Sequence, residues 1–121
     1  MIKKEGEFMK TYIIVKFQFE GFHFWKDAPM EVDFLKKPHR HIFYCEVKLP
    51  VTHDDRQLEF FMVKKALQIA VKDIYNFDLG GKSCEMICED IITAVQSKYG
   101  LNKDITVSVF EDGENGAMVA T

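Results

Sequence analysis

The sequence predicts an α+β domain, an antiparallel sheet with two helices packed on one face. Apolar and polar residues alternate at 12–24, 39–51 and 105–111, which is the period of half-buried strands. Between residues 58 and 99 the apolar period lengthens to about three and a half residues, as in amphipathic helices. A short strand at 117–120 completes the order strand, strand, helix, helix, strand, strand.

One folded unit is expected, because 121 residues, 47% of them apolar, suffice for one core and are too few for two. The first eight residues carry several charges around Gly6 and predict a flexible extension. The single domain is therefore expected to cover residues 9–121.

The first strand and the second are joined by a long segment. His23 closes the apolar face of the first strand, which carries Ile13, Val15 and Phe17. Residues 25–38 contain two prolines and mixed charges, which predicts a loop. The second strand begins at His39.

Two helices are expected between the strand pairs. The first covers 58–75, and its apolar stripe is Phe60, Val63, Leu67, Ala70, Val71 and Ile74. A turn at 76–82 leads to Ser83, an N-cap residue for a second helix that reaches Tyr99. The stripe of that helix is Met86, Ile87, Ile91, Ala94 and Val95, and Gly100 predicts its end.

Composition argues against several classes of protein. The net charge is −3 and the lysines are dispersed, so a nucleic-acid partner is not expected. No apolar run approaches the roughly 20 residues that cross a bilayer, and no signal peptide is evident, which predicts a cytoplasmic protein without a membrane partner. Three cysteines fit free thiols in a reducing compartment. The many aromatic residues suit either a subunit interface or a Phe-rich core.

Three histidines form a candidate metal site. His39 and His41 are one residue apart on a strand and project from the same face. His23 joins them if the first two strands pair antiparallel through the long loop. Three neutral imidazoles with a fourth position open are the arrangement of a catalytic zinc site. The alternative is a pair of surface histidines near a strand start. His53, in a charged turn, is expected to be solvated.

Glu111 continues the alternating positions that carry apolar residues in the last long strand. A carboxylate at such a position is costly to bury unless it has a partner. A ligand with a guanidine-like edge, such as a pterin or guanine, would supply two parallel N–H bonds. The alternative is that the strand ends by Phe110 and Glu111 faces water. Glu85, in the first turn of a helix, is favourable there without any function.

Taken in order, these segments resemble the 6-pyruvoyltetrahydropterin and 6-carboxytetrahydropterin synthase family of the tunnelling fold. The matching segments are Phe19–His23, His39-Arg40-His41, Leu58-Glu59-Phe60, Ser83-Cys84-Glu85 and Val109-Phe110-Glu111. Together they extend over about residues 11–119.

By that resemblance His23, His39 and His41 are zinc ligands, Glu111 anchors the pterin, and Glu85 is a second substrate-binding candidate. The family forms oligomeric barrels, commonly two stacked trimers, with pockets between subunits. Its members convert dihydroneopterin triphosphate in routes to tetrahydrobiopterin or to the queuosine precursor.

The chain also departs from the family pattern. Residues 33–37 hold no cysteine where the family has its catalytic one, so Asp33 becomes the candidate base. Residues 71–82 lack the histidine of the family's Asp-His proton relay, for which Asp73 or Asp78 is a possible substitute. Arg40 replaces the glycine of His-Gly-His and is expected to point away from the metal.

Two functions follow. The first is a zinc-dependent lyase acting on dihydroneopterin triphosphate, with Asp33 as base. The second is an inactive tunnelling-fold protein that binds a pterin-, purine- or nucleotide-like ligand, which the missing cysteine and histidine favour.

Overall fold

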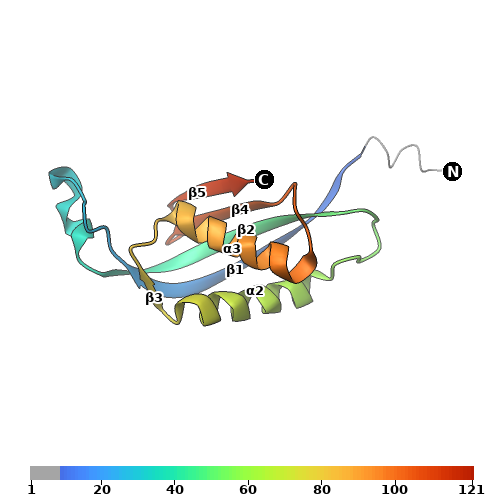
Figure 1. Cartoon of the computed structure of the whole chain (residues 1–121), viewed down its shortest axis with the longest axis horizontal. Coiled ribbons are helices and arrows are strands. Elements are labelled where there is room, and N and C mark those ends of the chain that lie inside the picture. Colours follow the sequence, from blue (N-terminus) through green and yellow to red (C-terminus); the bar gives the residue numbers. More distant parts are fainter. Residues whose placement is uncertain (1–8) are drawn as a thin grey trace.

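The computed structural model describes residues 9–121, so the extension predicted at 1–8 lies outside the described residues. The fold is α+β, with five strands and three helices (Figure 1). In chain order the elements are β1 (Thr11–His23), the 3-10 helix η1 (Met30–Lys36), β2 (His39–Val51), α2 (Phe60–Tyr75), β3 (Asp78–Gly80), α3 (Cys84–Tyr99), β4 (Thr106–Glu111) and β5 (Asn115–Ala120).

The five strands form one sheet in the order β3-β1-β2-β4-β5. The pairs β1–β2, β2–β4 and β4–β5 are antiparallel, as predicted, whereas β3 runs parallel to β1. The sheet is therefore mixed, and the purely antiparallel sheet expected from the sequence is wrong at this edge. The backbone turns at Asn76 and Phe77, both with positive φ, and brings the Phe77 carbonyl within 2.8 Å of the Phe22 amide.

Gly21 makes the close approach of β3 possible. A Cβ atom at this position would lie 2.1 Å from Leu79 Cδ1, which is well inside van der Waals contact. Leu79 is buried, so it has little room to move aside. The short parallel strand can therefore pack against the end of β1 only because residue 21 has no side chain.

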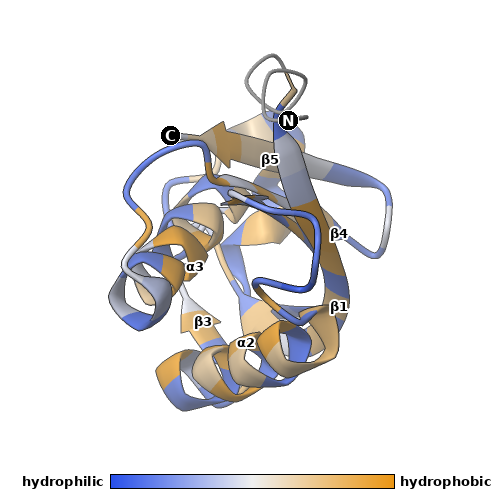
Figure 2. Ribbon diagram, turned by 90° about the vertical axis from the view of Figure 1, so that its right-hand side faces the viewer, coloured by the Kyte–Doolittle hydropathy of each residue, from blue (hydrophilic) through white to orange (hydrophobic). Residues whose placement is uncertain are grey.

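Helices α2 and α3 lie on the same side of the sheet (Figure 2). Helix α2 packs mainly on β1, and α3 packs on β4 and β5. The alternating residues that face these helices are buried, as predicted: Val15, Phe17, Phe43, Cys45, Val47, Leu49, Val107 and Val109. No helix in the described part of the chain is long and apolar enough to cross a membrane.

The buried stripes of the helices differ in detail from those predicted. On α2 the buried residues are Val63, Leu67, Val71 and Tyr75, whereas Phe60 and Ile74 are about half exposed. Because α2 lies over β1, near one side of the sheet, only a narrow face of it meets other residues. Helix α3 packs across two strands, β4 and β5, and buries a wider face, although Met86 in its first turn is exposed.

The predicted ends of α3 are confirmed. Ser83 Oγ accepts a hydrogen bond from the Met86 amide at 3.2 Å, and Gly100 ends the helix with a φ of 69°. Helix α2 begins two residues later than predicted, because the carboxylate of Glu59 caps it by accepting from the amides of Phe61 and Met62.

The segment predicted as a loop at 25–38 contains the helix η1. It lies beyond the end of the sheet, away from α2 and α3 (Figure 1). None of the residues of η1 is buried. It is joined to the sheet by the end of β1 and the start of β2, the two places where the histidines lie.

Candidate metal centre

Strand pairing brings the three histidines to one end of the sheet. His23 lies opposite His39, and Gly21 lies opposite His41, in the antiparallel ladder of β1 and β2. Residues of one parity share a face of the sheet, so the three imidazoles project toward the side that the helices cover. The antiparallel pairing across residues 25–38, on which the predicted cluster depended, is confirmed.

Each histidine has an oxygen atom beside its Nδ1 atom. His23 Nδ1 lies 2.9 Å from the carbonyl of Lys82, and His39 Nδ1 lies 2.9 Å from the carbonyl of Lys37. His41 Nδ1 lies 2.7 Å from Asp112 Oδ2. A carbonyl oxygen can only accept, so Nδ1 carries the proton in His23 and His39, and a carboxylate favours the same tautomer in His41. The Nε2 atom of each ring is then free to bind a cation.

The imidazoles converge. Their ring centroids are 4.6 to 5.2 Å apart, and one nitrogen from each ring lies within 4.8 Å of the other two. The Nε2 atoms of His23 and His41 are buried and have no hydrogen-bond partner among the described residues. Such an atom costs free energy unless something binds it. Three imidazoles anchored through their other nitrogen can hold a metal ion, and the donor set fits that role.

Glu111 is the last residue of β4 and lies opposite Phe43. Its Oε2 atom is 3.2 Å from His23 Nε2, and its Oε1 atom is 3.4 Å from His41 Nε2. The alternative in which the strand ends by Phe110 and Glu111 faces water is wrong, because the carboxylate is turned toward the histidines.

Asp112 is a residue that the sequence analysis missed. It follows β4 in a left-handed conformation, with a φ of 55°, and its Oδ1 atom accepts from the Ile42 amide at 2.9 Å. This amide and the His41 ring lower the pKa of the Asp112 carboxyl, so it is ionised beside His41. Only its position next to Glu111 could have drawn attention to it, since aspartate is ordinary in such a turn.

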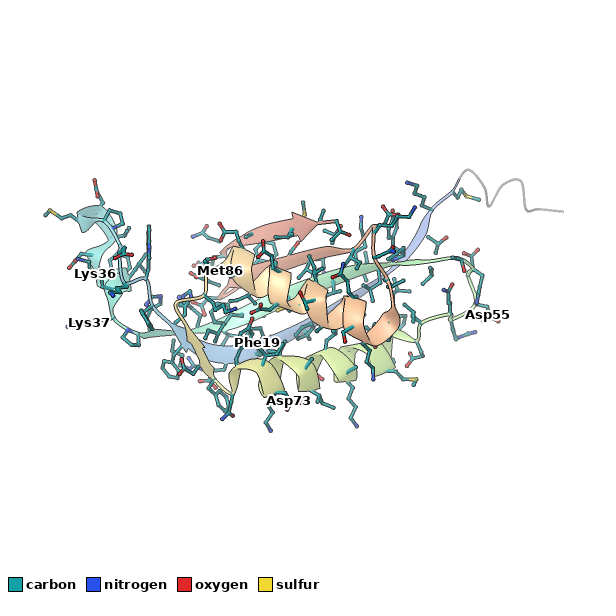
Figure 3. The ribbon with its side chains drawn as sticks, viewed as in Figure 1. Phe19, Lys36, Lys37, Asp55, Asp73 and Met86 are labelled. Carbon is teal, nitrogen blue, oxygen red and sulfur yellow. The ribbon has the colours of Figure 1, made fainter. Side chains whose placement is uncertain are left out.

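A cavity of about 510 Å³ opens beside the cluster. Two of the histidines, both predicted substrate-binding carboxylates and two aromatic residues line it: His23, His39, Glu85, Glu111, Phe24 and Trp25. The start of α3 forms one wall, where the labelled Met86 lies near the histidine end of the sheet (Figure 3). The structure thus brings together five of the six predicted site residues: the three histidines, Glu85 and Glu111.

The sixth predicted residue, Asp33, lies elsewhere. It is on η1, where its carboxylate pairs with Lys36 Nζ at 3.0 Å and its side chain is 65% exposed. It does not line the cavity. Asp73 lies on the side of α2 away from the sheet (Figure 3), and Asp78 accepts from the Gly80 amide. None of these carboxylates reaches the histidines within one chain.

Burial changes the pKa of two groups around the centre, His23 and Cys84. Burial lowers the pKa of His23, which keeps the ring neutral and able to coordinate. Burial, helped by the Glu111 carboxylate, raises the pKa of the Cys84 thiol to about 12. Cys84 therefore stays a thiol and donates to Glu111 Oε2 at 3.8 Å.

The three cysteines are free, as predicted. His53 is exposed, also as predicted.

No protein-family model matches the sequence, and no curated protein matches it. The fold is similar to the crystal structure of the uncharacterized protein WS1659 from Wolinella succinogenes, with a TM-score of 0.67. The match covers 93% of this chain and 98% of the other at 12% sequence identity. At this identity the likeness shows a shared α+β fold and nothing about activity.

Proposed function

We propose that the protein is a zinc-dependent lyase of the pterin synthase type, with His23, His39 and His41 as the metal ligands. The observation that carries the proposal is the set of three imidazoles whose Nδ1 atoms are anchored and whose Nε2 atoms converge. Neutral imidazole nitrogens suit zinc, and two of the three face the cavity from its wall. Bound zinc would polarise an oxygen of the substrate or acidify a bound hydroxyl.

The proposed substrate is dihydroneopterin triphosphate. A cavity of about 510 Å³ is the size of ordinary small-molecule sites. Trp25 and Phe24 offer flat apolar faces for a bicyclic ring, and Glu85 and Glu111 can accept parallel N–H bonds from its guanidine-like edge. The carboxylates orient the ring so that its side chain extends toward the histidines.

Assembly into a tunnelling-fold barrel of two stacked trimers is part of the proposal. The outer edge of β1 is paired only at Phe22 and His23, and β5 is the other edge of the sheet. Open edges of this length pair readily with another copy. In such a ring η1, which extends beyond its own sheet, would carry Asp33 toward the cavity of a neighbouring subunit, where it would serve as the base.

A second candidate function is binding without catalysis. Among the described residues of one chain, the cavity offers no proton acceptor other than the two carboxylates proposed to hold the ring. Asp33 is bound to Lys36, and the thiol of Cys84 is held protonated. A proton transfer needs an acceptor within hydrogen-bonding reach. The second candidate is therefore a protein that binds a pterin- or purine-like ligand without converting it.

One experiment separates the two functions. Metal-loaded protein is incubated with dihydroneopterin triphosphate while bound pterin and released triphosphate are followed. We expect release that is lost in His41→Ala and retained in His53→Ala, since His53 is exposed and away from the cluster. Binding without release selects the binding protein. If the protein neither binds the pterin nor releases triphosphate, both proposed functions are refuted.

A further inference from the structure

We propose that Glu111 is a fourth protein ligand of the metal when the cavity holds no ligand, so that the centre has three imidazoles and one carboxylate. This inference rests on the proposed zinc centre and changes the part played by Glu111 in it.

The distances are those of ligands that share one ion. Zinc binds nitrogen and carboxylate oxygen at roughly 2.0–2.2 Å, so two ligands of a tetrahedral site lie about 3.4 Å apart. Glu111 Oε2 lies 3.2 Å from His23 Nε2, and Glu111 Oε1 lies 3.4 Å from His41 Nε2. The two oxygens of one carboxylate therefore lie at ligand-to-ligand distance from one ring each.

The two ring nitrogens that face the carboxylate are left without a partner. Both contacts are short enough for hydrogen bonds, yet neither Nε2 atom has a hydrogen-bond partner among the described residues. A buried nitrogen in this state costs free energy unless something binds it.

Tautomers support the same conclusion. Nδ1 of His23 donates to the Lys82 carbonyl, and Nδ1 of His41 faces Asp112, so the Nε2 atoms present lone pairs. Two lone pairs facing a carboxylate repel it unless a cation lies between them. A metal ion satisfies all three groups, whereas an empty gap satisfies none.

The position of Glu111 is fixed from two sides. Its backbone pairs with Phe43 in β2 and with Asn115 in β5, so the residue is held in the sheet on both sides. Cys84 donates its thiol hydrogen to Oε2 from the start of α3. A hydrogen-bonded carboxylate on a rigid strand is typical of a metal ligand with an outer partner.

The test measures metal binding without substrate. Zinc affinity is determined by competition with a chromogenic chelator, and the cobalt(II)-substituted protein is examined by visible absorption. We expect Glu111→Gln to weaken zinc binding by on the order of 10-fold or more, a loss that removing even an outer partner can cause. We also expect it to change the cobalt d–d bands.

Glu85→Gln is the matched control, because Glu85 lines the same cavity and makes no recorded contact with a histidine. It should keep the zinc affinity and the cobalt spectrum of the unmodified chain. Circular dichroism of each metal-free variant verifies folding. If a folded Glu111→Gln variant binds zinc as tightly as Glu85→Gln and gives the same cobalt spectrum, Glu111 is not a ligand, while the three-histidine centre stands. If the unmodified chain does not bind zinc, or His41→Ala binds it equally well, the proposed centre itself is refuted.

Discussion

Each histidine of the centre turns one nitrogen inward because an oxygen holds the other. For His23 and His39 that oxygen is a backbone carbonyl, which no substitution of a side chain removes. For His41 it is the carboxylate of Asp112. Asp112 is therefore a positioning residue that can be tested by substitution.

Asp112→Asn should weaken zinc binding by about 10- to 100-fold, the usual cost of losing a carboxylate that orients a metal-bound histidine. The amide keeps the size of the side chain but presents a donor or a weaker acceptor to the His41 ring. Chelator competition measures the affinity. Asp104→Asn is the control, since Asp104 also has a positive φ and has no recorded contact with the cluster. Equal affinities in the two variants would contradict the positioning role.

Contacts between elements hold the wall of the cavity. The Tyr75 hydroxyl, at the end of α2, donates to Asp90 Oδ2 of α3 at 2.6 Å. Lys82 Nζ, in the segment between the helices, binds the same oxygen at 2.8 Å. The carbonyl of Lys82 in turn accepts from His23, so the contact between α2 and α3 also helps to place one of the three histidines of the proposed metal centre.

Tyr75 makes folding stability depend on pH. Burial and its bond to Asp90 raise the pKa of Tyr75 above the ordinary value of 10.0. Above that pH the unfolded chain loses a proton that the folded chain keeps, so the free energy of unfolding falls as pH rises. The loss is up to about 1.4 kcal/mol per pH unit until the folded-state pKa is reached.

Tyr75→Phe should remove this part of the alkaline loss. Urea unfolding at a series of pH values above 10 measures it, compared with the unmodified chain. The buried thiols give a loss of the same sign, because the pKa of Cys88 is raised to about 11, and that part should remain in the variant. An alkaline slope equal to that of the unmodified chain would show that Tyr75 ionises freely in the folded state.

At the scale of the molecule, the sheet ends in strands that other copies can extend. Beyond Phe22 and His23, the outer edge of β1 has no partner among the described residues, and β5 forms the opposite edge. Apolar side chains lie exposed near both edges, at Ile14 and Met118. These features favour edge-to-edge assembly.

The proposed barrel predicts a mass that can be measured. Light scattering after size exclusion should give a mass near six chains of 14.1 kDa. Met118→Lys, which adds a charge to the edge strand β5, should lower that mass, whereas Met62→Lys on the exposed side of α2 should not. A monomeric mass for the unmodified chain would refute the barrel.

The sequence alone located most of the elements and the three histidines. Alternation in Val15, Phe17, Val47 and Leu49 predicted buried strand faces because side chains alternate along any strand, whatever it pairs with. The parallel strand β3 was missed because its three residues carry no period, and its pairing depends on Gly21, far away in the chain.

For the candidate centre, local pattern determined which residues face inward: His23, His39, His41 and Glu111 all continue an apolar parity. Tertiary structure decided how they are oriented, through the Lys82 carbonyl, the Asp112 carboxylate and the approach of Glu111 to two rings. Parity is a property of a single strand and can be read along the chain. The direction of a ring nitrogen depends on acceptors contributed by other segments, and only the folded chain brings those together.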